Sequence, residues 1–488
     1  MKRMLATIAA LGSLTVLGCA SGDQQSGDQQ TAVSSLPQGS ADAASGKPNI
    51  IILFADDLGY GDLGVQGDRE ARTPNIDRMA AGGVRLTNYY SNHPVCSPSR
   101  AALMTGVYQH RMGFEHNSGT PRLTSPKFGI SQDLPTLPER LKAAGYATGM
   151  FGKWHVGFRP ETQPSARGFD TFYGFLSGAH SYTPAGLGGT RANTIQRGTQ
   201  PAPMPAHLTE AFADEAVKFI RTNKDKPFFV YLPFNAVHSP MESTDPYLER
   251  FRSVPDKNRR THLAMLSALD DAVGRVLTTL EEEGVADNTL VIFTSDNGGP
   301  TQETTSSNGP LNGVKGTVLE GGIRVPAIVQ WKGALPAGKV VDTASIGFDM
   351  TATALAVAGV LPTTGLDGVN LIPYLNGRSA GDAHKELFWR AGTQGAMRSG
   401  KWKLIKNGDT WHLFDLSTDI GERKDLVAQQ PQKLAELKAG WMKWSAEMKA
   451  PMWIRNELSP GNPPAPPARS EAIERFIRGE SAAVPAGD

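Results

Sequence analysis

The stretch that decides the fold is Asn49-Ile50-Ile51-Ile52-Leu53-Phe54-Ala55, and it ends in the acidic pair Asp56-Asp57. The apolar run is unbroken and rich in β-branched residues, a pattern typical of a strand buried on both faces of a parallel sheet. Two carboxylates directly after such a strand predict that polar chemistry lies at its carboxyl end.

The same pattern recurs further along the chain. Buried strands are predicted over residues 146–151, 228–232 and 290–294, and helices with apolar residues at helical spacing precede them over 136–144, 209–220 and 263–280. Helices that alternate with buried strands predict an α/β fold with a large, mostly parallel sheet flanked by helices. Ligands of such sheets bind beyond the carboxyl ends of the strands. The residues found there are Asp56, Asp57, Lys153, His155, His238, Asp296 and Asn297.

The C-terminal part of the chain has a different sequence pattern. Short strand-like pieces over 385–390, 401–406 and 410–414 precede a helix with Leu434, Leu437, Trp441, Trp444 and Met448 on one face. We predict a large domain over 48–375, a small C-terminal α+β domain with an antiparallel sheet and a helix over 376–455, and a Pro-rich tail over 456–488 with a short helix near 471–478. Tryptophans gathered in the small domain favour an aromatic core over a sugar-stacking surface. Residues 183–207 read as one long loop.

The N-terminus predicts export. A basic start, an apolar stretch over 4–17 and the small residues around Gly18 indicate a signal peptide over 1–18, too short for a spanning helix of roughly 20 apolar residues. Residues 16–19 resemble a bacterial lipoprotein box, so we expect a lipid anchor at Cys19, a disordered tether over 19–47, and a location in the periplasm or on the cell surface of a bacterium. A plain soluble export signal is the alternative.

The composition of the chain limits the classes of protein to which it can belong. The 488 residues carry 49 Lys and Arg against 48 Asp and Glu, so no overall field favours nucleic acid. There are 2 cysteines, Cys19 and Cys96, which excludes a disulfide framework. Cys96 is then the one thiol available for chemistry in the mature domain.

Cys96 opens the run Cys96-Ser97-Pro98-Ser99-Arg100, which continues to Gly106. Pro in the first turn and Gly at the end predict a helix with Cys96 at its N-terminus, capped by Ser97. That position and the charge of Arg100 favour a bound anion or a thiolate. The alternative is an ordinary buried core cysteine.

Two pairs of residues offer oxygen ligands and no imidazole or thiolate: Asp56 with Asp57, and Asp296 with Asn297. This set suits a hard cation, and Ca²⁺ fits the number of ligands better than Mg²⁺. Plain turn chemistry is the alternative for either pair. Together with Arg100 and with Lys153, His155, His238 and Lys315 on loops, the set predicts a site for an anion with a transferable centre.

The run over 96–100, with Leu103 and Thr105-Gly106, resembles the Cys-x-Pro-Ser-Arg signature of the type I sulfatases, and Gly152-Lys153-Trp154-His155-Val156-Gly157 is similar to their second signature. The resemblance covers about 48–425. It implies an alkaline-phosphatase-like fold and oxidation of Cys96 to formylglycine by a maturation enzyme, with the hydrate as nucleophile. It also implies Ca²⁺ on Asp56, Asp57, Asp296 and Asn297, activation by Arg100 and His155, sulfate binding by Lys153 and Lys315, and assistance to the leaving alcohol by His238.

We therefore expect a sulfuric ester hydrolase that acts on sulfated carbohydrates or aryl sulfates. A phosphonate monoester or phosphodiester hydrolase of the same superfamily is the alternative reaction, and a non-catalytic glycan-binding lipoprotein is the alternative class. Further expectations place Asp62 and His93 behind the ligands, and His116, His180 and Tyr182 near the sugar.

Overall fold

The computed structural model describes residues 46–117, 127–186, 194–361, 365–453, 468–482 and 484. The expected signal peptide, the lipid anchor at Cys19 and nearly all of the tether lie outside these residues. Among them, no helix combines the length and the apolar character needed to cross a bilayer.

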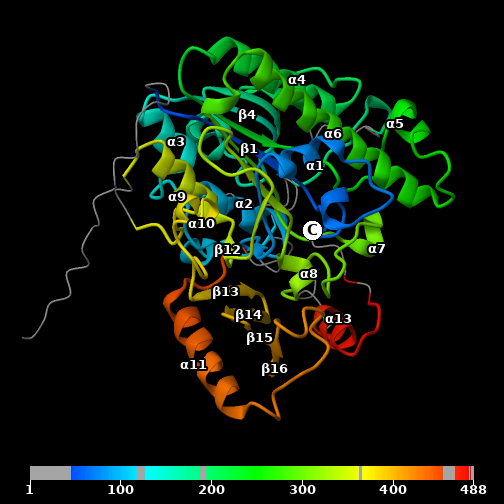
Figure 1. Cartoon of the computed structure of the whole chain (residues 1–488), viewed down its shortest axis with the longest axis vertical. Coiled ribbons are helices and arrows are strands. Elements are labelled where there is room, and N and C mark those ends of the chain that lie inside the picture. Colours follow the sequence, from blue (N-terminus) through cyan, green and yellow to red (C-terminus); the bar gives the residue numbers. More distant parts are fainter. Residues whose placement is uncertain are drawn as a thin grey trace, which may run out of the picture. The chain divides into compact units, whose positions relative to one another are not determined.

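A large mixed sheet forms the centre of the molecule (Figure 1). In spatial order its strands are β11 (Lys339–Val341), β2 (Val84–Leu86), β10 (Ala327–Gln330), β9 (Thr289–Ser295), β1 (Asn49–Ala55), β8 (Phe228–Pro233), β4 (Ala147–Lys153), β5 (Thr171–Phe175), β6 (Gln196–Arg197) and β7 (Gln200–Pro201). The central strands β9, β1, β8, β4 and β5 run parallel, and Ile52 of β1 pairs with Tyr231 and Ile292 on its two sides. The mostly parallel sheet predicted from the apolar runs is confirmed.

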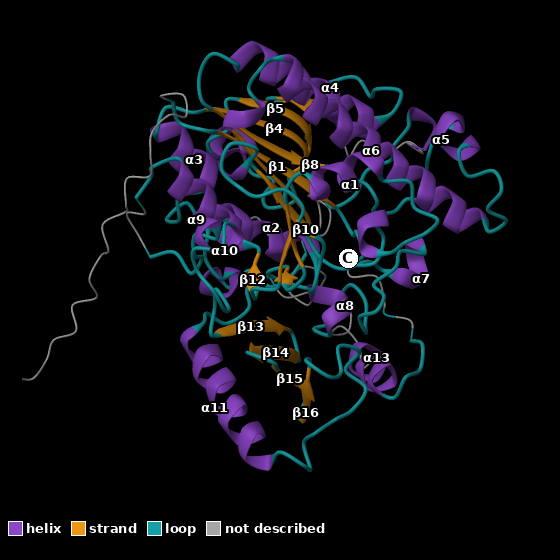
Figure 2. Cartoon of the chain, viewed as in Figure 1, coloured by secondary structure: helices purple, strands orange, loops and turns teal. Residues whose placement is uncertain are grey.

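Alternate residues of β1 enter two separate cores. Ile51 and Leu53 pack on one face of the sheet, and Ile50 and Ile52 pack on the other. The first face is covered by α1 (Pro74–Ala81), α4 (Leu208–Asn223) and α6 (Lys257–Glu282), and the second by α2 (Cys96–Thr105), α3 (Leu137–Ala143) and α9 (Phe348–Val357). Figure 2 shows these helices around the strands. Burial on both faces explains why the strand sequence is apolar without alternation.

Local signals set the helix ends. Thr136 and Glu139 form a reciprocal capping box at the start of α3, and Asp256 accepts a hydrogen bond from Arg259 N at the start of α6. Shorter helices complete the large domain: α5 (Asp245–Glu249), α7 (Thr301–Thr304), α8 (Glu320–Ile323), α10 (Ile372–Leu375), and the 3₁₀ turns η1 (Gly64–Gln66), η2 (Gln109–Met112), η3 (Pro160–Thr162), η4 (Pro164–Arg167), η5 (Pro184–Gly186) and η6 (Ala286–Asn288).

Two expectations about local structure were wrong. Val95 rather than Ser97 is the N-cap of α2, because the helix begins at Cys96 and Ser97 already lies in its first turn. The hydroxyl of Ser97 instead donates to the carbonyl of His155. The segment over 183–207 is not one continuous loop, since β6 and β7 form a hairpin that extends the main sheet.

The C-terminal region forms a four-stranded antiparallel sheet of β13 (Glu386–Ala391), β14 (Gln394–Ser399), β15 (Trp402–Asn407) and β16 (Thr410–Asp415), with α11 (Pro431–Glu447) packed on it. Its core includes Trp389, Trp441 and Trp444, as the aromatic-core interpretation predicts. The strand β14 was not predicted. The helix α13 (Ala468–Ile477) buries Ile473 in the same core, so part of the segment interpreted as a tail belongs to this domain.

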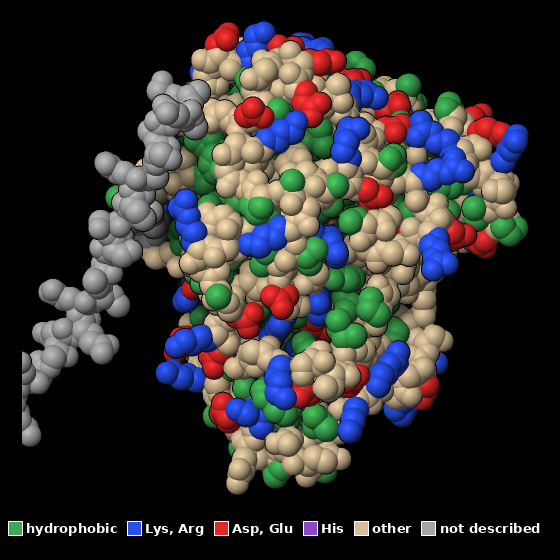
Figure 3. All heavy atoms as spheres, viewed as in Figure 1, with side chains coloured by type: hydrophobic (Ala, Val, Ile, Leu, Met, Phe, Trp, Pro, Cys, Tyr) green, Lys and Arg blue, Asp and Glu red, His purple; other side chains and the backbone are tan. Residues whose placement is uncertain are grey.

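Charges of both signs alternate on the face of the molecule that Figure 3 shows, consistent with the near-zero net charge. No single-sign surface is visible on that face.

Candidate active site

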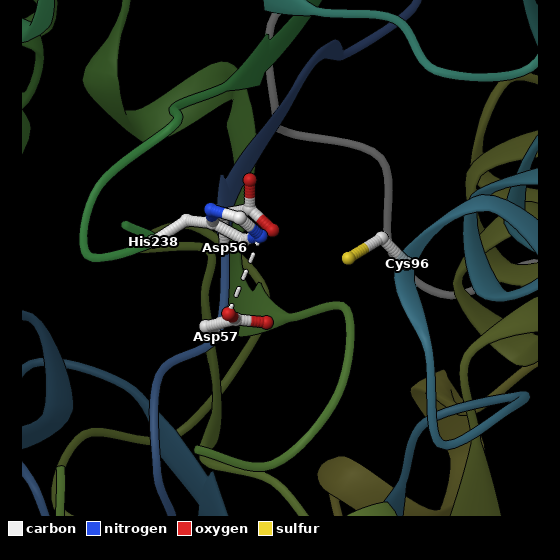
Figure 4. Close-up of side chains that lie close together, drawn as sticks. All are labelled: Asp56, Asp57, Cys96 and His238. Atoms are coloured by element: carbon white, nitrogen blue, oxygen red, sulfur yellow. Dashed lines mark ion pairs between the residues drawn. The ribbon is translucent and has the colours of Figure 1, made fainter. Parts of the chain in front are cut away.

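The carboxyl ends of the central strands bring the predicted residues together. β1 is followed by Asp56 and Asp57, β9 by Asp296 and Asn297, β4 carries Lys153 at its end, and β8 leads to His238. Cys96 and Arg100 come from the first turns of α2, and Lys315 comes from the loop before α8. Figure 4 shows Asp56, Asp57, Cys96 and His238, whose ligand atoms all lie within 4.8 Å of one another.

Three cationic side chains contact the three carboxylates; each cation has one close partner, and Arg100 also lies 3.4 Å from Asp56. All six side chains are buried, and Lys315 is the most exposed of them at 9%. The contacts join Arg100 Nη2 to Asp296 Oδ2 at 2.7 Å, Lys153 Nζ to Asp56 Oδ2 at 2.6 Å, and Lys315 Nζ to Asp57 Oδ2 at 2.8 Å. The formal charges of these side chains cancel.

Burial and neighbouring charges shift the pKa values of the three carboxylates in different directions. Burial raises the pKa of Asp56, but the charges of Lys153 and Arg100 outweigh it, so the net shift is downward. The pKa of Asp57 is lowered in the same way, with burial opposed by Lys315 and His238. The pKa of Asp296 is raised by burial and by the charge of Asp56. Three carboxylates at one point therefore repel one another even with their cationic partners in place.

The side-chain oxygen atoms of two pairs of residues suit a cation: Asp56 with Asp57, and Asp296 with Asn297. Asp56 Oδ1 and Asn297 Oδ1 are buried and accept no hydrogen bond, although the first lies 3.4 Å from Arg100 Nη2. The amide nitrogen of Asn297 donates to Asp57 Oδ1 at 2.7 Å, which turns its carbonyl oxygen away from that partner. Buried oxygens without a donor are costly unless a ligand or ion satisfies them. These residues therefore fit a hard cation such as Ca²⁺.

Cys96 is buried at the start of α2. Burial and the charge of Asp296 raise the pKa of its thiol above the usual range. Burial therefore opposes the thiolate that the helix N-terminus was expected to favour at the unmodified residue.

Two of the predicted site residues are histidines, and one of them, His238, lies beside the carboxylates. His238 Nε2 lies 3.6 Å from Asp57 Oδ2, and its Nδ1 lies 2.6 Å from the carbonyl of Ser239. His155 has a positive φ of 62°, which is uncommon for a residue with a side chain. Its ring lies over Gly178, where a Cβ atom would approach Nε2 to 2.7 Å, so only glycine fits beneath it.

Asp62, one of the two residues expected behind the ligands, lies next to the loop of Asp57. Asp62 is buried, accepts hydrogen bonds from Gly59 N and Ser307 N, and lies 3.3 Å from His262 Nε2. It therefore holds the loop that follows Asp57. The hydroxyl of Tyr182 donates to the carbonyl of His238 at 2.8 Å and so helps to hold that histidine in place. This contact differs from the contact with the sugar that was expected of Tyr182.

Asn117 was missed by the sequence reasoning. Its Oδ1 accepts the hydrogen bond of Ser97 N at 2.9 Å and so supplies the cap expected of Ser97. Asn117 lies outside the signature and after η2, so only knowledge of the chain path would reveal it.

Known proteins of similar sequence identify the family of this chain. The family described as Sulfatase matches residues 48–360. The N-acetylgalactosamine-6-sulfatase of Homo sapiens is 38% identical over 360 residues, which cover 69% of this chain and 67% of that protein. Arylsulfatase A of Homo sapiens is 36% identical over 444 residues, which cover 79% of this chain and 84% of that protein.

A solved structure is similar to this chain over most of its length. Ps i-CgsB in complex with k-i-k-neocarrahexaose superposes with a TM-score of 0.79 at 34% identity, covering 83% of this chain and 94% of that chain. The fold is that of the alkaline-phosphatase-like superfamily. Within it, the chain belongs to the sulfatase family, and it is a sulfuric ester hydrolase.

Proposed function

We propose that the protein hydrolyses sulfate monoesters of carbohydrates through a formylglycine derived from Cys96, with Ca²⁺ held by Asp56, Asp57, Asp296 and Asn297. The observation that carries the proposal is the gathering of Cys96, Arg100 and two lysines around the three buried carboxylates. Beside them, Asp56 Oδ1 and Asn297 Oδ1 are buried and accept no hydrogen bond. The saccharide bound to Ps i-CgsB and the sugar sulfatases among the relatives support a carbohydrate substrate.

Each side chain then has a task. The hydrate of formylglycine would supply a hydroxyl that attacks sulfur, and Ca²⁺ would supply positive charge to the sulfate oxygens. Lys153 and Lys315 lie where they can bind the remaining oxygens of the substrate. His238, at the more exposed edge of the site, is placed to give a proton to the departing alcohol oxygen.

Arg100 and His155 act on the residue at 96. Arg100 follows it by one helical turn, and its guanidinium is fixed by Asp296 and by the carbonyl of Lys153. The backbone of His155 is tied to the first turn of α2 through Ser97. In the proposed reaction, His155 takes the proton of the second hydroxyl when the aldehyde reforms and sulfate leaves.

The charge of the site favours sulfate over phosphate. Its three carboxylates and three cations cancel, so one divalent ion leaves a modest positive charge. A sulfate monoester carries a single negative charge near neutral pH, and a phosphate monoester carries close to two. Among the described residues there is one candidate group of metal ligands, so no second ion is expected to neutralise a dianion. The desolvation of the dianion would then cost more than it regains.

The test uses matured protein and a matched aryl pair. We expect p-nitrophenyl sulfate to be hydrolysed with a kcat/KM about a hundredfold or more above that of p-nitrophenyl phosphate. Chelation should remove the activity and Ca²⁺ should restore it. Peptide mass spectrometry should find an aldehyde at position 96, and Cys96→Ala should be inactive. Equal turnover of the phosphate or a phosphonate ester would support the alternative hydrolase, and a matured protein without esterase activity would support the glycan-binding alternative.

We also propose that the mature chain begins at Cys19 as a lipoprotein of the bacterial periplasm or cell surface. Two or more acyl chains give stable anchoring, whereas one is marginal. The native protein should partition into detergent, and Cys19→Ser should release it. Native protein that is soluble and cut at another residue would contradict the anchor.

A further inference from the structure

The loop that carries His238 is held by a tyrosine from a different loop. Tyr182 lies beyond the end of β5, and its side chain is buried. Its hydroxyl lies 2.5 Å from the carbonyl oxygen of Asn235 and 2.8 Å from that of His238. The amide of His238 donates to the carbonyl of Asn235 at 2.9 Å. The hydroxyl of Tyr182 therefore bridges the two ends of the turn that leads from β8 to His238.

Tyr182 is itself fixed on several sides. The carboxylate of Glu242 accepts a hydrogen bond from the backbone N–H of Tyr182 at 2.9 Å, and the carbonyl of Tyr182 accepts one from Leu208 N at 2.9 Å. Its ring is stacked on that of His207, with 6.2 Å between the ring centroids. The hydroxyl is therefore held in one place and can define where His238 lies.

A carboxylate from α7 holds the next residue of the loop. The hydroxyl of Ser239 donates to Glu303 Oε1 at 2.5 Å, and the carbonyl of Ser239 lies 2.6 Å from His238 Nδ1. A carbonyl oxygen can only accept, so Nδ1 carries a hydrogen in this contact. The other ring nitrogen, Nε2, lies 3.6 Å from Asp57 Oδ2 (Figure 4). Both ends of the imidazole are thereby oriented, and Nε2 is the end directed into the site.

We propose that Tyr182 and Glu303 are positioning residues that align His238 Nε2 with the alcohol oxygen of the scissile ester. This inference rests on the proposed function, in which the Nε2–H bond breaks and its proton forms an O–H bond on the departing alcohol. The electron pair of the broken S–O bond stays on that oxygen. A misplacement of about 1 Å can cost a reaction step about a hundredfold, so the anchors of the loop control how well the proton is delivered.

The test compares two aryl sulfates whose leaving groups differ in their need for a proton. p-Nitrophenolate leaves readily without one, whereas phenolate depends on it more strongly. We expect Tyr182→Phe to lower kcat/KM for phenyl sulfate by about tenfold or more, and kcat/KM for p-nitrophenyl sulfate by about threefold or less. Inhibition by inorganic sulfate should be unchanged, because the side chains proposed to bind sulfate remain.

Glu303 gives a second test that leaves the buried residues intact. Its side chain is exposed, so its loss should not disturb the core. Glu303→Ala should lower kcat/KM for phenyl sulfate by about threefold and leave that for p-nitrophenyl sulfate nearly unchanged. Glu303→Gln keeps an oxygen that can accept from Ser239 and should restore most of the loss.

Tyr247 offers a matched control on the other side of His207. Its ring lies 5.7 Å from that of His207, and its hydroxyl donates to Glu210 Oε1 at 2.9 Å instead of to the loop of His238. Tyr247→Phe removes the same atom from the same kind of packing. It should leave the ratio of kcat/KM for the two esters unchanged.

His238→Ala is the reference, and it should lower kcat/KM for phenyl sulfate far more than that for p-nitrophenyl sulfate. If His238→Ala shows this selectivity but Tyr182→Phe and Glu303→Ala lower both esters equally, the positioning role is overturned. The same selective loss in Tyr247→Phe would also overturn it. A His238→Ala variant without selectivity, or a matured enzyme that hydrolyses neither ester, would instead contradict the proposed function on which the inference rests.

Discussion

At the scale of single residues, the geometry around position 96 depends on a hydroxyl outside the expected set of reactive groups. Ser97 donates to the carbonyl of His155, and both residues are buried. A left-handed backbone at a residue such as His155 persists only where its surroundings hold it in place. Ser97 is therefore a positioning residue for His155.

Ser97→Ala should lower kcat for an aryl sulfate by about tenfold, with little change in KM, because a misplaced base loses proximity and keeps substrate binding. Kinetics on protein whose aldehyde content at 96 has been measured will check this. Thr105→Ala, at the far end of the same helix, removes a hydroxyl bonded to Ala101 O and should leave kcat unchanged. An equal loss in both variants would show that helix stability, and not His155, is responsible.

The proposed metal ligands allow a prediction that does not require catalysis. A cation that binds only the folded chain raises its melting temperature in proportion to affinity and concentration. Ca²⁺ added after chelation should raise the Tm of the parent protein, and Asn297→Ala should lose about half or more of that shift, because a buried ligand oxygen is removed.

Differential scanning fluorimetry over a Ca²⁺ titration measures both shifts. Asp214→Asn removes a carboxylate that is 62% exposed and pairs with Arg275 away from the site, so it should keep the full response. A calcium shift that survives unchanged in Asn297→Ala would remove that residue from the ligand set.

At the scale of elements, the small domain is joined to the catalytic loop by buried ions. Lys403 of β15 contacts Glu320 of α8 at 2.7 Å and Glu422 at 3.1 Å, and all three side chains are fully buried. Burial raises the pKa of Glu422 to about 7, while the charge of Lys403 opposes burial and lowers the pKa of Glu320 to about 2. One lysine thus stabilises two carboxylates at the start of α8, directly after the loop of Lys315.

Removal of that lysine should be costly. Lys403→Met leaves two buried carboxylates without their cation and should lower the free energy of unfolding by about 3–5 kcal/mol. Adding Glu422→Gln should recover part of the loss. Lys401→Met removes a pair with Asp415 whose lysine is 52% exposed, and should cost about 1 kcal/mol or less. Chemical denaturation will compare the variants, and equal costs at Lys401 and Lys403 would contradict the argument.

Elements with strong local signals could be predicted, and contacts between distant elements could not. The apolar runs of β1, β8 and β9 correctly indicated the sheet, so the polar residues after them could be placed at one edge. The strand β14 was missed because Gln394–Ser399 has no apolar run or clean alternation. Asn117 acts through a tertiary contact with Ser97, and no pattern near Asn117 points to that partner.

At the scale of the whole molecule, buried histidines make stability depend on pH. His110 is buried between Tyr108 and Trp444, and its Nε2 lies 3.0 Å from the carbonyl of Arg390. Burial lowers the pKa of His110 from 6.5 to about 3; the hydrogen bond to the carbonyl of Arg390 opposes this shift, and the charge of Arg390 adds to it. As the pH falls below about 6.5, the unfolded chain therefore binds a proton at His110, whereas the folded chain keeps the imidazole neutral. The contribution of His110 to stability is complete above pH 6.5 and is lost progressively as the pH falls toward 3.

His110→Gln removes this titration. The difference in unfolding free energy between the parent protein and the variant should shrink by about 2 kcal/mol between pH 7.5 and pH 5, since each pH unit below 6.5 costs about 1.4 kcal/mol. His384→Gln is the matched control of opposite sign. Burial lowers the pKa of His384, but the hydrogen bond to Asp349 at 2.8 Å and the charges of nearby carboxylates together outweigh burial and raise the pKa overall. Its stabilising contribution is therefore present at low pH and lost as the pH rises. Denaturation curves at both pH values should therefore give differences that change in opposite directions, and parallel changes would contradict the assignment of the buried neutral state to His110.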